Sequence, residues 1–148
     1  MNTLKKTGET SIHDGLDLSL CVFDLDTNLL SFSGAFRPVL LYQNKILERY
    51  KTFPYSIGGC DFIKKEFETI NIQLEKGDIV YLFTDGYPDQ FGGERGKKLY
   101  LKGFQDLINS CVELGMDEQH RILSVFLKDW MGNKNQIDDV LVMGIKIT

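Results

Sequence analysis

The chain has 148 residues, of which 43% are hydrophobic and 26% are charged, and this composition suits one globular domain, or part of one, with an ample core. The net charge of −4 argues against nucleic acid or an acidic membrane surface as a partner. The three cysteines form no CxxC pair and no apolar run is long enough to span a membrane, so we expect neither a zinc site nor a disulfide framework, no membrane contact and a cytoplasmic location.

The first half of the chain predicts a succession of short strands. Residues 1–14 are polar and predict the end of a helix followed by a loop. Apolar or alternating runs then predict strands at residues 16–24, 29–33, 39–43, 46–50, 67–74 and 79–83. Turn residues separate these strands at 26–28, 34–38, 44–45, 54–59 and 76–78. Strands 16–24 and 29–33 should form a hairpin.

Helices are predicted only in the second half. Apolar residues at helical spacing predict helices over residues 99–114 and 117–130, with Gly115 ending the first and Asp117 capping the second. Their expected buried stripes are Leu99, Phe104, Leu107, Ile108 and Cys111, then Ile122, Leu123, Phe126, Leu127 and Trp130. A last strand is predicted at 140–147. Strands in series, then two helices, then one strand indicate an α+β fold with a mostly antiparallel sheet.

One acidic position stands at the end of the central predicted strand. The apolar run 79–83 ends at Thr84, and Asp85-Gly86 follows at once. We expect Gly86 to turn the chain with a positive φ and so to hold the Asp85 carboxylate at the rim of the sheet. A hard divalent cation prefers such fixed oxygen ligands. A simple Asp-Gly turn without a metal is the alternative.

A second acidic position precedes the last predicted strand. Asp138 and Asp139 are adjacent, and two neighbouring carboxylates are costly to keep ionised at a sheet edge without a cation. One geometry consistent with both strand ends places Asp85 and Asp138 at the same rim, where they share metal.

Several stretches of the chain resemble a known family in order and spacing. They are DGLD at 14–17, SGAFRP at 33–38, IGG at 57–59, KGDIVYLFTDGYPD at 76–89, QFGGERGKK at 90–98 and QIDDVLV at 136–142. Together they are similar to the C-terminal part of bacterial metal-dependent serine/threonine phosphatase domains of the sporulation stage II E and sigma-B regulator type, a branch of the PP2C-like superfamily. Leu141 stands where that family usually has threonine.

This resemblance implies a two-metal phosphatase built on a β-sandwich flanked by helices, with Mn²⁺ or Mg²⁺ as cofactor. Asp85 and Asp138 correspond to metal ligands in the matching motifs. Asp139 and Gly86 would support those ligands, or Asp139 would serve only as a turn residue. Asp14 and Asp17 are expected to be structural. Arg37 and Arg95 are candidate phosphate contacts, although a plain surface position is the simpler interpretation of each.

The resemblance also implies a substrate and a missing segment. The substrate would be phosphoserine or phosphothreonine on a regulatory protein of the anti-sigma-factor antagonist type, with a sensor domain upstream in the natural protein. The family's earlier Asp-x-x-Gly-His-Gly motif, which also holds metal, has no counterpart in the sequence. We therefore interpret residues 1–148 as a partial domain and expect it to hydrolyse little phosphate by itself.

Two other interpretations remain open. A domain without the first metal aspartate could bind a phosphoprotein or transmit a signal without catalysis. Alternatively, the strand ending in DLDT resembles the nucleophile motif of haloacid-dehalogenase-type phosphatases, with Asp24 attacking phosphorus, Asp26 as acid and base, and Asp138 and Asp139 holding Mg²⁺. That fold requires a helix after the motif, whereas this sequence continues into a second strand.

Overall fold

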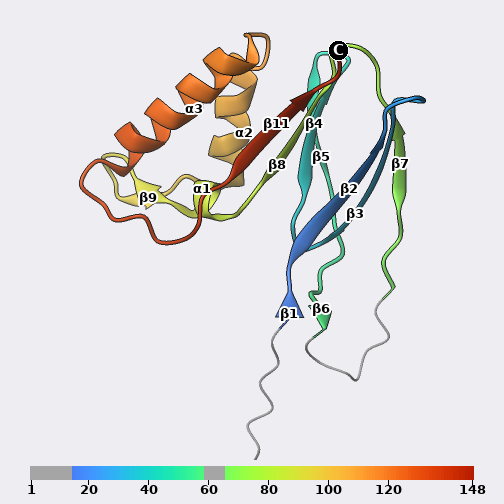
Figure 1. The fold of residues 1–148 in the computed structure, drawn as a ribbon. Coiled ribbons are helices and arrows are strands. Elements are labelled where there is room, and N and C mark those ends of the chain that lie inside the picture. Colours follow the sequence, from blue (N-terminus) through green and yellow to red (C-terminus); the bar gives the residue numbers. More distant parts are fainter. Residues whose placement is uncertain (1–14, 59–65) are drawn as a thin grey trace, which may run out of the picture.

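Two antiparallel sheets stack face to face, with two helices outside one of them (Figure 1). The computed structural model describes residues 15–58 and 66–148, so the predictions for residues 1–14, including Asp14, and for Gly59 lie outside the described residues. The first sheet contains β4 (Val39–Gln43), β5 (Ile46–Tyr50), β8 (Ile79–Phe83) and β11 (Val142–Lys146) in the order β11-β8-β4-β5. The second contains β2 (Leu18–Asp24), β3 (Leu29–Ala35) and β7 (Ile70–Gln73) in the order β2-β3-β7.

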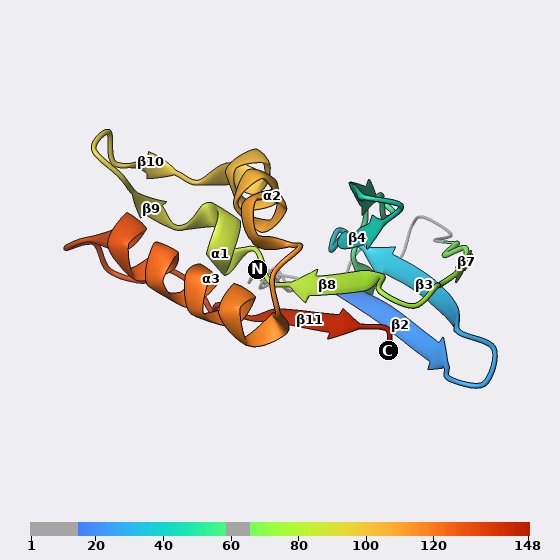
Figure 2. The ribbon, with the colours of Figure 1, turned by 90° about the horizontal axis from the view of Figure 1, so that it is seen from above.

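The two long helices are α2 (Tyr100–Cys111) and α3 (Met116–Met131), and both lie on the same side of the first sheet. Seen from above, β8 and β11 run between these helices on one side and β2 and β3 on the other (Figure 2). Every strand pair in the two sheets is antiparallel. The predicted α+β class, a mostly antiparallel sandwich flanked by helices, is therefore confirmed.

The two central strands of the first sheet, β4 and β8, are buried on both faces, because successive side chains point to opposite sides of a strand. On β4, Leu40 packs into the core beneath the helices, whereas Val39 and Leu41 pack into the core between the sheets. On β8, Ile79 faces the helices and Val80 faces the second sheet. This burial on two faces explains why residues 79–83 form a continuous apolar run instead of an alternating one.

The first helix buries most of its predicted stripe, whereas in the second stripe only Leu123 is buried and the other four residues are half-buried. The ends of both helices also differ from the prediction. Phe104, Ile108 and Leu123 are buried. The second helix begins at Met116, one residue earlier than predicted, and extended Gly115 is its N-cap, so the predicted cap at Asp117 is wrong and Asp117 lies in the first turn. The first helix ends at Cys111, not at residue 114.

A buried glutamine closes the corner between the helices and β8. The Gln119 side chain accepts a hydrogen bond from the Tyr81 hydroxyl at 2.6 Å and donates to the carbonyl oxygens of Val112 and Leu114 at 3.0 and 2.9 Å. Since Gln119 is only 2% exposed, these bonds satisfy polar groups that water cannot reach. Among the described residues, no helix is long and apolar enough to cross a membrane.

Several strand boundaries differ from the predicted ones. The predicted strand 16–24 is interrupted at Asp17, where β1 (Gly15–Leu16) pairs with β6 (Ile57–Gly58) inside a predicted loop. The predicted strand 67–74 shortens to β7, and 29–33 lengthens through Ala35. The Asn44-Lys45 turn has positive φ at both residues, 52° and 63°, as two-residue hairpin turns require.

Candidate functional site

The end of β8 carries the first of the two predicted acidic positions. Asp85 is the N-cap of a four-residue helix, α1 (Gly86–Asp89), and its side chain is 41% exposed. The expected positive φ at Gly86 is wrong: Gly86 is the first residue of α1 and is absent from the positive-φ glycines of the described chain. A Cβ at Gly86 would lie 2.3 Å from the Asp139 carbonyl oxygen. Glycine is therefore needed here for close approach of two backbone segments, and left-handed geometry plays no part.

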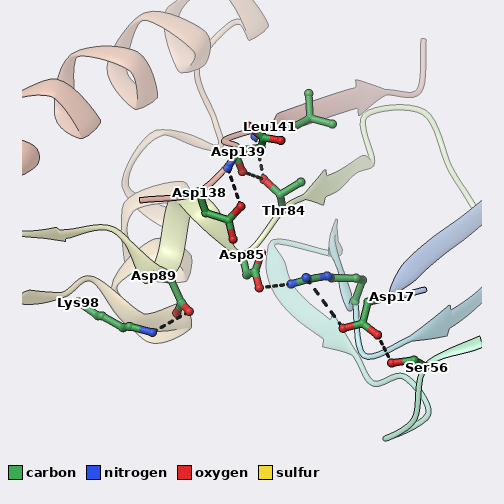
Figure 3. Close-up of polar contacts among 10 residues, drawn as sticks. Asp17, Ser56, Thr84, Asp85, Asp89, Lys98, Asp138, Asp139 and Leu141 are labelled. Atoms are coloured by element: carbon green, nitrogen blue, oxygen red, sulfur yellow. Dashed lines mark hydrogen bonds and ion pairs between the residues drawn. The ribbon is translucent and has the colours of Figure 1, made fainter. Parts of the chain in front are cut away.

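The Thr84 hydroxyl ties the second acidic position to the first. Thr84 Oγ1 donates to the carbonyl oxygen of Asp139 at 2.7 Å and accepts from the Leu141 N–H at 2.9 Å. The Thr84 N–H also donates to the Leu141 carbonyl oxygen at 3.1 Å. These bonds hold the segment before β11 against the end of β8. They bring Asp138 and Asp85 to one rim of the sheet (Figure 3).

The two adjacent aspartates differ in what they contact. Asp138 Oδ1 accepts a hydrogen bond from the Asp139 N–H at 2.7 Å, and the Asp138 carbonyl oxygen accepts from Gln136 Nε2 at 2.8 Å. Asp139 contributes its backbone carbonyl to Thr84 and to the close packing on Gly86. The structure thus places Asp85, Gly86, Asp138 and Asp139 together, and the role of Asp85 and Asp138 as metal ligands stays a prediction.

An arginine contacts the Asp85 carboxylate directly. Arg37 Nη1 lies 2.5 Å from Asp85 Oδ2, and Arg37 Nη2 lies 4.0 Å from Asp17 Oδ2. Asp17 also accepts a hydrogen bond from the Ser56 hydroxyl (Figure 3). Sequence reasoning considered Arg37 for phosphate and Asp17 as structural, and it identified neither ion pair. Arg37, Asp17 and Asp85 lie in three separate matching stretches, so local pattern could not show that they contact one another.

The remaining charged candidates lie on α1 and on the hairpin of β9 (Phe91–Gly92) and β10 (Lys97–Lys98). Asp89 Oδ2 lies 2.8 Å from Lys98 Nζ, and this hydrogen bond raises the pKa of Lys98. Arg95 lies exposed between β9 and β10. A hollow of about 190 Å³ beside Asp85 is lined by Arg37 and Asp89, among others, and not by Arg95.

The donor set suits a hard cation in kind but is small in number. Asp85 and Asp138 offer the carboxylate oxygens that Mg²⁺ and Mn²⁺ prefer. Within residues 15–58 and 66–148, however, no group of three or more His, Cys, Asp or Glu side chains is arranged to hold a metal ion. Asp85 and Asp138 are therefore too few, among the described residues, to hold a metal ion by themselves, and Arg37 already neutralises the Asp85 carboxylate.

The dehalogenase interpretation is wrong for this fold. Asp24 ends β2, and its Oδ1 accepts hydrogen bonds from the N–H groups of Asp26 and Thr27 at 3.0 and 3.1 Å. These bonds shape the turn of an antiparallel hairpin with β3, where the dehalogenase motif needs a parallel unit. The hairpin turn and α1 also lie at opposite ends of the sheets (Figure 1).

Comparisons with known proteins agree with this fold. The model of a family described as Stage II sporulation protein E (SpoIIE) matches residues 2–148. No curated protein sequence matches the chain. Among solved structures, the SiaA-PP2C domain of Pseudomonas aeruginosa is similar with 25% identity and a TM-score of 0.81, over 89% of this chain and 52% of that one.

Two further solved structures share the fold at lower identity. The phosphatase domain of the cell fate determinant SpoIIE from Bacillus subtilis has 17% identity and a TM-score of 0.61, over 88% of this chain and 56% of that one. The RsbU and RsbW domains of a Mycobacterium tuberculosis protein have 18% identity and a TM-score of 0.64, over 88% of this chain and 35% of that one. The chain thus spans about half the length, or less, of these three solved chains.

Proposed function

The chain belongs to the stage II sporulation protein E family, whose solved relatives have the PP2C phosphatase fold, and we propose that it supplies Asp85 and Asp138 to a divalent-metal site that hydrolyses a phosphoprotein. The observation that carries the proposal is the pairing of two strand ends. Hydrogen bonds of the Thr84 hydroxyl hold the segment after Asp138 against the end of β8. The carboxylates of Asp85 and Asp138 therefore lie at the same solvent-accessible rim of the sheet. When bound, Mn²⁺ or Mg²⁺, two ions in a complete domain, would supply Lewis-acid activation of water and of the phosphoryl oxygens.

The proposed substrate is a phosphoserine or phosphothreonine on a small regulatory protein of the anti-sigma-factor antagonist type. Family membership supports this class of substrate, as it supports an upstream sensor domain and a cytoplasmic location. The half-exposed Asp85 carboxylate and the adjoining hollow leave the rim accessible to a phosphorylated side chain.

A non-catalytic role as a phosphoprotein-binding domain is the second candidate. It is favoured by the incomplete donor set among the described residues and by the Arg37 guanidinium beside Asp85. A guanidinium at the rim can bind phosphate without any metal. The two candidates differ in whether Asp85 must bind a cation for the protein to act.

The deciding experiment measures Mn²⁺ binding and Mn²⁺-dependent hydrolysis of a phosphopeptide, in a chain lengthened upstream to the full size of the solved domains. Asp85→Asn and Asp138→Asn should each abolish hydrolysis and weaken Mn²⁺ binding, because each removes a charged ligand. Asp106→Asn, which removes a surface carboxylate paired with Lys102, is the matched control and should change neither. Hydrolysis that survives both Asp85→Asn and Asp138→Asn would contradict the proposal.

A further inference from the structure

The backbone around Arg37 is held in one unusual conformation. Phe36 has a φ of 57°, which side chains other than glycine rarely adopt, and its N–H donates to the Phe53 carbonyl oxygen at 2.9 Å. The Arg37 carbonyl oxygen accepts a hydrogen bond from the Ser19 hydroxyl. A Cβ at Gly34 would lie 2.8 Å from that same carbonyl oxygen. The turn between β3 and β4 therefore fixes where the Arg37 side chain starts.

From that fixed turn, the guanidinium reaches two carboxylates from different parts of the chain, Asp17 between β1 and β2 and Asp85 after β8. Its Nη1 contacts Asp85 at 2.5 Å, and its Nη2 lies at the outer limit of an ion pair with Asp17, at 4.0 Å. The Ser56 hydroxyl holds Asp17 in place. Dashed lines in Figure 3 mark these ion pairs and the Ser56 hydrogen bond. Arg37 thus forms a close ion pair with Asp85, and a small shift of its side chain would bring it into a close ion pair with Asp17.

A divalent cation and a guanidinium cannot share one carboxylate oxygen without strong repulsion. Arginine stays protonated at all ordinary pH values, so a cation that takes Asp85 Oδ2 has to displace the Arg37 guanidinium from that oxygen. The pair is easy to open, because both side chains are partly exposed, at 29% and 41%, and exposed ion pairs contribute little free energy.

We propose that Arg37 is a built-in counter-cation for Asp85, which neutralises the carboxylate when no metal is bound and withdraws to Asp17 when a divalent cation displaces it. The proposal rests on the proposed function in one respect, namely that the cation binds at Asp85. Arg37 is then a positioning residue that sets the metal affinity of the rim.

The test is Mn²⁺ affinity of the 148-residue chain, measured by electron paramagnetic resonance of free Mn²⁺. Arg37→Gln should bind Mn²⁺ about fivefold more tightly than the unchanged chain, since Asp85 no longer has a competing cation. Arg37→Lys keeps the positive charge and should stay close to the unchanged chain. Lys98→Gln removes the same charge from the neighbouring Asp89 pair and should have a clearly smaller effect than Arg37→Gln.

Each outcome decides a separate point. An Arg37→Gln chain that binds no more tightly than the unchanged one, including the case in which neither binds, overturns the inference, and so does an equal effect of Lys98→Gln. The double variant Arg37→Gln/Asp85→Asn tests the premise, because it should lose the gained affinity. If the double variant binds as tightly as Arg37→Gln alone, the cation is not at Asp85 and the proposed function fails instead.

Discussion

The Thr84 hydroxyl donates a hydrogen bond to the carbonyl oxygen of Asp139 over 2.7 Å, although the two residues are 55 positions apart in the chain. The Thr84 hydroxyl oxygen also accepts a hydrogen bond from the Leu141 N–H, so one side chain satisfies two backbone groups. These two hydrogen bonds hold the segment before β11 against the end of β8, so that both contribute to one rim of the sheet. The threonine of the TDG motif therefore shapes the site without offering a ligand itself.

Replacing the Thr84 hydroxyl should loosen this rim. Thr84→Val keeps the shape but removes both hydrogen bonds of Oγ1, and we expect a loss of about 1–2 kcal/mol in the free energy of unfolding. Urea unfolding followed by tryptophan fluorescence measures the change. Thr84→Ser keeps a hydroxyl and should lose less. A Thr84→Val protein as stable as the unchanged chain would contradict this role of the hydroxyl.

Gly86 should tolerate no side chain. Gly86→Ala would force a Cβ to within 2.3 Å of the Asp139 carbonyl oxygen, and the backbone shift this requires should cost about 2–3 kcal/mol of unfolding free energy. Gly115→Ala is the matched control, because nothing lies within 4 Å of its Cβ position. The control should lose less than about 1 kcal/mol, the cost of a poorer N-cap. A Gly86→Ala protein as stable as the control would rule out the close approach.

The 148-residue chain alone should bind Mn²⁺ weakly and hydrolyse little p-nitrophenyl phosphate, because affinity for hard cations falls with fewer charged ligands. A chain lengthened upstream to the size of the solved domains should hydrolyse it at the same Mn²⁺ concentration. Parallel assays of the two chains make the comparison. If the 148-residue chain turns over substrate as fast as the longer one, the ligands must come from within it, and Asp139 and Asp89 would be tested first.

Asp24 should matter for stability and not for hydrolysis. Hydrogen bonds from the Thr27 side chain and from the N–H groups of Thr27 and Asp26 lower the pKa of Asp24. The charged form is therefore favoured in the folded chain, and its stabilising effect is present above the ordinary pKa of 3.8 and lost as the pH falls through the lowered value. Asp24→Asn should reduce the thermal midpoint at neutral pH, with a smaller difference in acid.

The effect of Asp24→Asn on activity is measured in the chain lengthened upstream to the size of the solved domains. Asp24→Asn should leave its phosphatase rate unchanged, whereas a nucleophilic aspartate could not be replaced without losing the rate. A loss equal to that of Asp85→Asn would contradict the purely structural role of Asp24.

The described cysteines should react slowly with thiol reagents. Burial raises the pKa of Cys21 to about 11 and raises that of Cys111 as well. Only the thiolate reacts, so in a Cys60→Ser background the native chain should react with Ellman's reagent at pH 8 far more slowly than the urea-unfolded chain. Because the pKa of Cys21 is raised from 9.0, its contribution to stability is present below pH 9 and declines as the pH rises towards 11. Equal native and unfolded rates at pH 8 would contradict this prediction.

Local pattern was enough to predict much of this fold. The strands 39–43, 46–50 and 79–83 have the predicted boundaries, because each is a short apolar run closed by turn residues. The order of strands before helices predicted the antiparallel sandwich. The two acidic strand ends were also visible in the sequence, since Asp85 and Asp138 each stand beside a strong strand signal.

Only the tertiary structure decided what these residues contact. The hydrogen bond between Thr84 and Asp139, the contact between Gly86 and the same carbonyl, and the ion pair between Arg37 and Asp85 all join segments far apart in the chain. Pattern within a window reports the period of one strand or helix, whereas these contacts depend on how strands from both halves of the chain pair and stack. The sequence by itself therefore indicated which acidic residues stand at the strand ends. Only the fold decided that Arg37 neutralises one of them.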